Sequence, residues 1–256
     1  MTQKELNKQL VSAAQSGNVA DVRSALEAGA DVNVKGPYDW TSLMEATEYG
    51  DIAMIKLLLE YGADPDIRDN EGNTALMNAC YGGYTETAEL LLNCGVDPNI
   101  RNKYGATAFI HATWHGHTET SRLLLKYKAD IDMADSRGDT PLMIACKNPG
   151  GKRDLITMLI TAGANLEKIN NYGYGMTALM YLARNGYTGL MKLLIKDGAD
   201  MNIKDAQGRT ALDILKEFHP EKYDKWIKRA TIKAKKKTLK REDSTRSIGC
   251  APDFNI

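Results

Sequence analysis

Apolar residues recur along this chain in short clusters at helical spacing, separated by polar turns that contain glycine. Within residues 74–100, Leu76 and Ala79 lie on one face of a first short helix, and Ala88 and Leu91 lie on the buried stripe of a second. A glycine follows each helix, as is typical of a residue that ends a helix in the left-handed conformation. The pattern predicts a unit made of a helix, a turn, a second helix and an extended turn.

This unit repeats along most of the chain. A triplet of threonine, a small residue and an apolar residue recurs at spacings of 33, 33, 33, 37 and 33 residues, and a triplet similar to Gly-Ala-Asp follows in phase. Threonine is a good helix N-cap, and helices this short are not stable alone, so the units must stack to bury their apolar faces. The recurring threonines are Thr41, Thr74, Thr107, Thr140, Thr177 and Thr210.

Over about residues 6–216, the period and the Thr-x-Leu…Ala…Gly…Leu-Leu…Gly-Ala-Asp pattern closely resemble the ankyrin repeat. The resemblance implies an all-α fold, a curved ankyrin-repeat solenoid of helix-turn-helix repeats, whose extended turn tips and first helices line a concave side. It has five full repeats and two capping units. We expect an N-terminal cap over residues 1–34; repeats over 35–67, 68–100, 101–133, 134–168 (with an inserted inter-helix loop) and 169–203 (with an extended turn tip); a C-terminal cap over 204–230; and a basic, flexible tail over 231–256.

Two departures from the repeat pattern lead to specific expectations. The first unit lacks the threonine triplet, and Val11, Val22 and Leu26 are predicted to form its core. Lys128 stands where other repeats have the glycine that ends the second helix. A lysine held at positive φ there costs about 1–2 kcal/mol.

The sequence predicts no catalytic residues, no cofactor and no metal site. His111 and His115 are spaced i, i+4 on one predicted helix, but a zinc site needs further ligands and no HExxH motif is present. Nearly every polar feature recurs from repeat to repeat, as structural residues do, whereas an active site would occur once. We therefore expect a binding module and not an enzyme.

In the ankyrin pattern, the turn tips and the outward side of the first helix make most partner contacts. Tyrosine and tryptophan are enriched at these slots, as they are in binding hot spots. Trp40 and Trp114 are predicted to contribute most, although some of these aromatic residues can instead pack along neighbouring tips. The predicted partner-binding residues are Tyr38, Trp40, Glu48, Tyr49, Asn73, Tyr81, Lys103, Tyr104, Trp114, His115, Arg137, Lys147, Tyr174 and Arg184.

One turn further inside the predicted concave side lies a second column of polar residues. The same slot carries isoleucine in other repeats, so polar residues there indicate a hydrogen-bonding floor to a groove, the alternative being a solvated groove without a partner. The column consists of Glu45, Asn78, His111 and Tyr181.

The net charge of zero hides an uneven distribution. Residues 216–256 carry 12 Lys and Arg against 6 Asp and Glu, so the rest of the chain is acidic. This basic stretch favours weak contact with nucleic acid or anionic lipid. The alternative is a tail that only increases solubility and binds nothing. The candidate polyanion-binding residues are Lys228, Arg229, Lys233, Lys235, Lys236, Lys237, Lys240 and Arg241.

The predicted function is that of an adaptor or inhibitor that holds another protein on its concave face. The alternative is a targeting protein whose basic tail docks on nucleic acid or an anionic membrane while the solenoid holds the partner. No apolar run reaches the roughly 18–20 residues needed to span a bilayer, and the start of the chain does not resemble a signal peptide. We expect a cytoplasmic protein that is not transmembrane, with a nuclear location as the alternative in a eukaryote.

Overall fold

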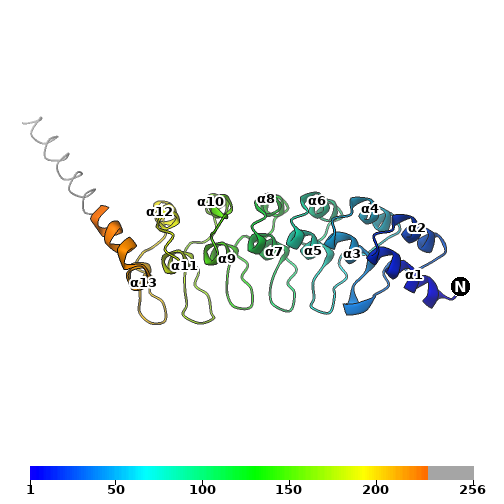
Figure 1. Ribbon diagram of the computed structural model, residues 1–256, viewed down its shortest axis with the longest axis horizontal. Helices are drawn as coiled ribbons and strands as arrows, with labels where there is room; N and C mark the ends of the chain where they lie inside the picture. The colour runs from blue at the N-terminus through cyan, green and yellow to red at the C-terminus, as the bar shows by residue number, and fades with distance from the viewer. Residues whose placement is uncertain (230–256) are drawn as a thin grey trace, which may run out of the picture.

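The computed structural model describes residues 1–229 as a row of helix pairs joined by long hairpin loops (Figure 1). The described residues form no strands, and this confirms the predicted all-α ankyrin-repeat solenoid. The helices are α1 (Gln3–Gln15), α2 (Val19–Glu27), the 3₁₀ helix η1 (Pro37–Asp39), α3 (Ser42–Glu48), α4 (Ile52–Glu60), α5 (Ala75–Gly82), α6 (Thr85–Asn93), α7 (Ala108–His115), α8 (Thr118–Lys126), α9 (Pro141–Lys147), α10 (Arg153–Thr161), α11 (Ala178–Arg184), α12 (Thr188–Lys196) and α13 (Ala211–Phe218).

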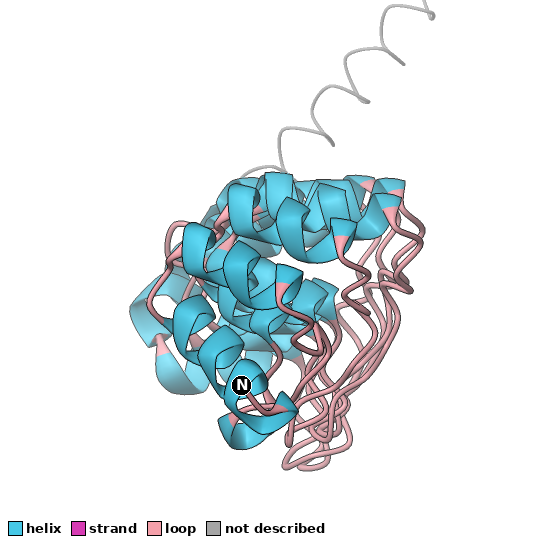
Figure 2. Ribbon diagram, turned by 90° about the vertical axis from the view of Figure 1, so that its right-hand side faces the viewer, coloured by secondary structure: helices cyan, strands magenta, loops and turns pink. Residues whose placement is uncertain are grey.

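The helices form two layers, with the hairpin loops projecting from one side (Figure 2). The inner layer, next to the hairpins, contains α1, α3, α5, α7, α9, α11 and α13, and each of these helices packs against the next (Figure 1). The even-numbered helices from α2 to α12 form the outer layer, and the apolar core fills the space between the layers. We call the surface formed by the inner helices and the hairpin loops the hairpin face.

The recurring threonines begin the inner helices, as predicted. The hydroxyl of Thr107, for example, accepts a hydrogen bond of 3.2 Å from the backbone N–H of Ile110. The other five threonines accept the equivalent bond at 3.3–3.4 Å. Each cap satisfies an N–H that a helix terminus leaves free.

The hairpin tips are tied together by a ladder of backbone hydrogen bonds. Lys103 N donates to Glu71 O at 2.9 Å, and Ser136 N donates to Tyr104 O at 2.9 Å. The same bond links the tips of the remaining neighbouring hairpins, including Ala206 N to Tyr174 O at 2.7 Å. The ladder fixes the spacing of side chains that come from successive tips.

The prediction for the first unit is partly wrong, while that for Lys128 is confirmed. Val22 and Leu26 are buried, but Val11 is only half-buried, because the helical period turns it about 100° away from the buried Leu10. Lys128 adopts a φ of +66°, the strained conformation expected where a glycine is missing.

Each predicted repeat from 35–67 to 169–203 contains one inner and one outer helix, and the exact boundaries stay predictions. In the predicted C-terminal cap, α13 is followed by helical residues 220–229, whose Tyr223 and Trp226 pack partly buried against the core. Residues 230–256 lie outside the described part of the chain.

Candidate functional site

A hollow of about 310 Å³ lies on the hairpin face in front of α7, between the third and fourth hairpins. Its apolar floor is formed by Ala106 and Ile110, which are both buried. The walls carry three exposed aromatic side chains: Tyr81 at 51% exposure, Tyr104 at 58% and Trp114 at 50%. We call this the α7 hollow. The remaining residues of its lining are Asn102, His111, His115, Asp135, Ser136 and Arg137.

Ring contacts and hydrogen bonds fix the wall that faces α5. The rings of Tyr81 and His115 lie 4.2 Å apart between centroids. Behind them, His117 Nε2 donates to the carbonyl oxygen of Tyr81 at 3.0 Å. This ring fits only because Gly83, at φ +74°, has no side chain, since a Cβ there would lie 2.5 Å from His117 Nδ1. The end of α5 is thereby held against α7.

Lys152 fixes the end of α7 in a similar way. Its ammonium donates to the carbonyl oxygen of Trp114, and its alkyl chain covers Gly116. A positive charge at a helix C-terminus is favourable because the last carbonyls are unpaired. Lys152 belongs to the loop that the fourth predicted repeat inserts between its helices. The insertion therefore supports the residue that forms one wall of the hollow.

His111 is the one side chain of the α7 hollow whose hydrogen-bonding atom is buried without a partner in the described part of the chain. The atom is Nε2, which has almost no exposed surface. Burial, followed by the nearby charge of His115, lowers the pKa of His111 to about 4. The pKa of His115 is lowered as well, first by burial and then by His117 and Lys152. His111 is therefore neutral at neutral pH, with an unused hydrogen-bonding nitrogen.

The hairpin wall of the α7 hollow is held by Asn102. Its side-chain oxygen accepts from the N–H groups of Tyr104 and Ala106, both at 2.9 Å, and its amide donates to Asn73 Oδ1 at 2.8 Å. Asn73, predicted to touch a partner, is thus engaged in the turn network and also donates to Asp69 at 3.1 Å. The hydroxyl of Tyr104 donates to Glu71 at 3.3 Å, so this ring packs along the neighbouring tip while its face stays exposed.

Two repeats further on, the same region of the repeat is closed by a polar network. Asp139, at 2% exposure, forms an ion pair with Lys147 and accepts a hydrogen bond of 3.1 Å from Asn170. The amide of Asn170 also donates to the hydroxyl of Tyr181 at 2.8 Å. The ammonium of Lys147 lies 4.8 Å from the centre of the Tyr181 ring. Lys147, predicted as a partner contact, is therefore half-buried and already paired.

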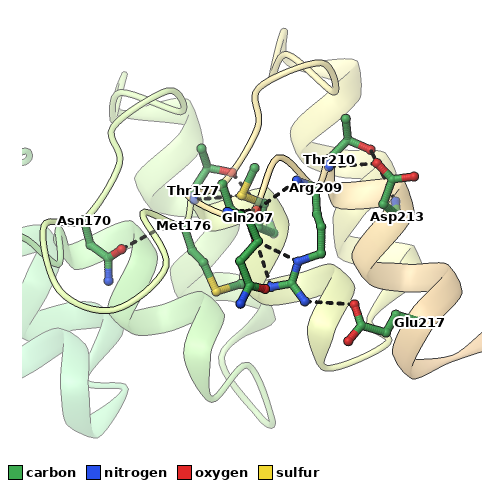
Figure 3. Close-up of polar contacts among 10 residues, drawn as sticks. Asn170, Met176, Thr177, Gln207, Arg209, Thr210, Asp213 and Glu217 are labelled. Carbon is green, nitrogen blue, oxygen red and sulfur yellow. Dashed lines mark hydrogen bonds and ion pairs between the residues drawn. The ribbon is translucent and has the colours of Figure 1, made fainter.

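A smaller hollow of about 190 Å³ lies between α11 and α13. The guanidinium of Arg209 lies 5.7 Å from the centre of the Tyr174 ring and forms an ion pair with Asp205 at 2.8 Å. It also forms an ion pair with Glu217 at 2.8 Å (Figure 3). The guanidinium carbon of Arg184 lies 5.6 Å from the centre of the Phe218 ring. Phe218 was not among the predicted partner-binding residues. The charged side chains of this second hollow thus already interact with other residues of the same chain.

The first full repeat differs from the prediction at Trp40. This ring, which directly follows η1, is half-buried and packs against the core. Tyr38 and Tyr49 are exposed as expected, and Glu48 is half-buried. Burial and the charge of Glu45 raise the pKa of Glu48. Among the predicted aromatic contacts, the structure groups Tyr81, Tyr104 and Trp114, but neither Trp40 nor Tyr49 lines the α7 hollow.

The four residues of the predicted groove floor have different environments. Glu45 accepts a hydrogen bond of 3.0 Å from Gln15, and Tyr181 is part of the closed network. Asn78, at 8% exposure, resembles His111, since its amide nitrogen has no partner in the described residues. The unused polar atoms of the column therefore lie on two adjacent helices, α5 and α7.

Other predicted features fall partly outside the structure. Lys228 and Arg229 are exposed at the end of the described region, whereas Lys233, Lys235, Lys236, Lys237, Lys240 and Arg241 lie outside the described residues. Within residues 1–229, no three His, Cys, Asp or Glu side chains come together in a way that could hold a metal ion. In the same region, none of the helices combines the length and apolar character needed to cross a membrane.

The repeat pattern did not predict a role for the floor residues Ala106 and Ile110 or for the supporting Lys152. Ala106 directly precedes the cap Thr107, where three other repeats have the polar Asn73, Asp139 and Arg209. Because two further repeats have the apolar Trp40 and Met176 in this slot, the pattern of the slot does not single out Ala106.

Comparison with known proteins agrees with this architecture. The family described as ankyrin repeats (3 copies) matches residues 10–102, 83–170 and 150–218. The crystal structure of the human ASB11 ankyrin repeat domain superimposes with a TM-score of 0.69 at 29% identity, covering 80% of this chain and 90% of that one.

Sequence relatives include the probable E3 ubiquitin-protein ligase XBOS34 of rice, 35% identical over 83 residues, and ankyrin repeat and SAM domain-containing protein 6 of rat, 34% identical over 83 residues. Each alignment covers 32% of this chain, but only 16% and 9% of the respective relative. The similarity is thus confined to repeat segments of larger proteins. Ankyrin repeats are in general protein–protein interaction modules and typically non-enzymatic scaffolds. With matches that extend from residue 10 to residue 218, this chain belongs to the ankyrin-repeat family.

Proposed function

We propose that this protein is an adaptor or inhibitor that holds a partner protein on the hairpin face, with the α7 hollow as the main anchor. The observation that carries the proposal is the grouping of three half-exposed aromatic rings, Tyr81, Tyr104 and Trp114, around one apolar floor. Rigid aromatic side chains bury a large area on binding at a small cost in conformational entropy. Their supports on α5, α7 and the inserted loop are built into this chain, so the wall is formed before a partner arrives.

Partner capture by wild-type protein beside a matched pair of variants tests this proposal. Trp114→Ala removes a wall of the α7 hollow, whereas Tyr61→Ala removes an exposed tyrosine at the end of α4 in the outer layer. Proteins captured by wild type and by Tyr61→Ala, but lost with Trp114→Ala, are the expected partners. If every captured protein is retained by Trp114→Ala, the anchor lies elsewhere.

A second candidate role concerns the basic stretch of residues 216–256, which carries 12 Lys and Arg against 6 Asp and Glu. This charge favours contact with nucleic acid or anionic lipid, so the chain would act as a targeting protein. Retention on heparin should fall steeply with salt through counterion release, and deleting the basic run of residues 228–241 should abolish it. Equal retention of the full-length and shortened proteins would contradict this role.

A further inference from the structure

The α7 hollow combines an apolar aromatic surface with one unused polar atom. Ala106 and Ile110 form the floor, and the rings of Tyr81, Tyr104 and Trp114 form the walls. Its volume of about 310 Å³ is sufficient for one large side chain. Aromatic rings prefer offset-stacked or edge-to-face neighbours, which these walls provide. An aromatic side chain of a partner is therefore the best steric and chemical match.

The polar atom narrows the choice among aromatic side chains. Nε2 of His111 is buried and has no hydrogen-bond partner among the described residues. A buried polar atom without a partner is unfavourable, and a ligand that supplies the missing hydrogen bond removes this cost. Phenylalanine has no atom for this purpose, whereas tyrosine and tryptophan each carry one polar atom on the ring.

The rim of the α7 hollow adds a preference in charge. Arg137 is exposed at the tip of the fourth hairpin, and no ion pair within residues 1–229 involves its guanidinium, which lies 5.8 Å from the ring of Tyr172. The carboxylate that lies nearest in sequence belongs to Asp135, and its Oδ1 accepts the backbone N–H groups of Arg137 and Asp139. The guanidinium is therefore available to a carboxylate of a partner, which it can bind through two parallel hydrogen bonds.

We infer that the α7 hollow binds a protein segment in which a tyrosine or tryptophan is followed or preceded by an acidic residue. The aromatic ring occupies the hollow, and the imidazole of His111 turns about its Cβ–Cγ bond so that Nε2 meets the polar atom of that ring. The acidic side chain pairs with Arg137 at the rim. This inference rests on the proposed function and specifies the chemistry of the partner.

The closed network at α11 shows why the inference does not extend to the equivalent slot of the fifth repeat. Tyr181 occupies the slot equivalent to His111, four residues after the capping threonine, but its hydroxyl already accepts a hydrogen bond from Asn170. Arg209, at the second hollow, is held by Asp205 and Glu217. Neither position offers a partner the same combination of an unused polar atom and an unpaired guanidinium.

Synthetic peptides titrated into the full-length protein and followed by NMR provide the test. The probes are the acetylated and amidated heptapeptides GSEYESG, GSEFESG and GSKYKSG. We expect saturable shifts of the His111 ring and the Trp114 indole N–H with GSEYESG. The phenylalanine peptide should bind at least about fivefold more weakly, and the lysine peptide at least about tenfold more weakly, because each loses one charge-assisted or buried hydrogen bond.

Matched variants assign each preference to its residue. His111→Leu should bind GSEYESG and GSEFESG equally, and Arg137→Ala should reduce the preference for glutamate over lysine. The comparison of the two peptides on wild-type protein does not depend on the folding of any variant. The absence of saturable binding, equal affinities for tyrosine and phenylalanine in wild type, or shifts confined to the second hollow would each overturn the inference.

The outcome can be separated from that of the proposed function. If partner capture depends on Trp114 while no peptide binds, the anchor stands and the inferred chemistry of its ligand is wrong. If GSEYESG binds at His111 while partner capture survives Trp114→Ala, the ligand chemistry stands and the partner is held by another surface.

Discussion

His111 and Tyr181 occupy the same slot of the repeat but differ in their hydrogen bonding. Each comes four residues after a capping threonine, on the hairpin face of an inner helix. Around Tyr181, Asn170, Asp139 and Lys147 close the slot with hydrogen bonds, an ion pair and a cation over the ring. Around His111, aromatic rings leave an open hollow and a nitrogen that has no hydrogen-bond partner within residues 1–229. One scaffold position can thus stabilise the solenoid or remain available to a ligand, depending on the residues that adjacent hairpins supply.

The largest expected effect comes from breaking the polar network around Tyr181, which we call the closed slot. Asp139→Ala should lower the free energy of unfolding by about 3 kcal/mol, the low end for breaking a buried ion pair, because Lys147 is partly exposed and can reach water. Urea unfolding measures this loss. Partner binding at the α7 hollow should persist in the folded variant, and a loss below about 1 kcal/mol would show that the network contributes little to stability.

The next largest effect is expected at the slot of His111, which we call the open slot, when the protein is acidified. The unfolded chain protonates His111 below about pH 6.5, whereas the folded protein does so only below about pH 4. Stability should therefore fall as pH is lowered through this window, by about 2–3 kcal/mol at pH 4, and it should recover as pH rises. Urea unfolding of wild type beside His111→Gln, which does not titrate, measures the difference.

His115, whose pKa is also lowered, contributes in the same direction and remains in this control. A smaller acid effect should therefore persist in His111→Gln. An identical pH dependence in wild type and variant would show that His111 is not the group responsible.

Removing a wall of the open slot should affect binding more than stability. Trp114→Ala should weaken the partner complex by at least about 2 kcal/mol, the usual threshold of a hot spot, and should change the melting temperature little because the ring is half-exposed. Paired measurements of affinity and melting temperature check this.

The opposite result is expected for Trp40→Ala. Because Trp40 packs on the core, that variant should lose stability and keep its affinity per folded molecule.

The smallest expected effect is at the hydroxyl of the closed slot. Tyr181→Phe removes the hydrogen bond from Asn170, whose amide still donates to Asp139. A loss of about 1 kcal/mol is expected in urea unfolding, the usual net contribution of one hydrogen bond. A loss as large as that of Asp139→Ala would mean that the hydroxyl, and not the ion pair, holds the network together.

The sequence predicted most of the fold and about half of the candidate site. Six of the predicted residues line the α7 hollow, namely Tyr81, Tyr104, Trp114, His111, His115 and Arg137. Trp40 was expected to be exposed because turn-tip residues of the repeat usually are, but its ring packs partly buried against the core. Ala106 and Lys152 were missed, since neither an alanine beside a cap nor a lysine in an inserted loop carries a local signal.

The sequence by itself determined the repeat, the helix caps and the positions where helices end. These features depend on contacts within a few residues, such as Thr107 with Ile110, and on an apolar period that recurs in every unit. Only the tertiary structure decided which slots are open and which are closed. That choice depends on side chains about one repeat apart, such as Asn170 and Asp139, which stacking brings within 3.1 Å. The periodicity of the chain places such residues at neighbouring tips, but their mutual distance and burial determine whether they pair.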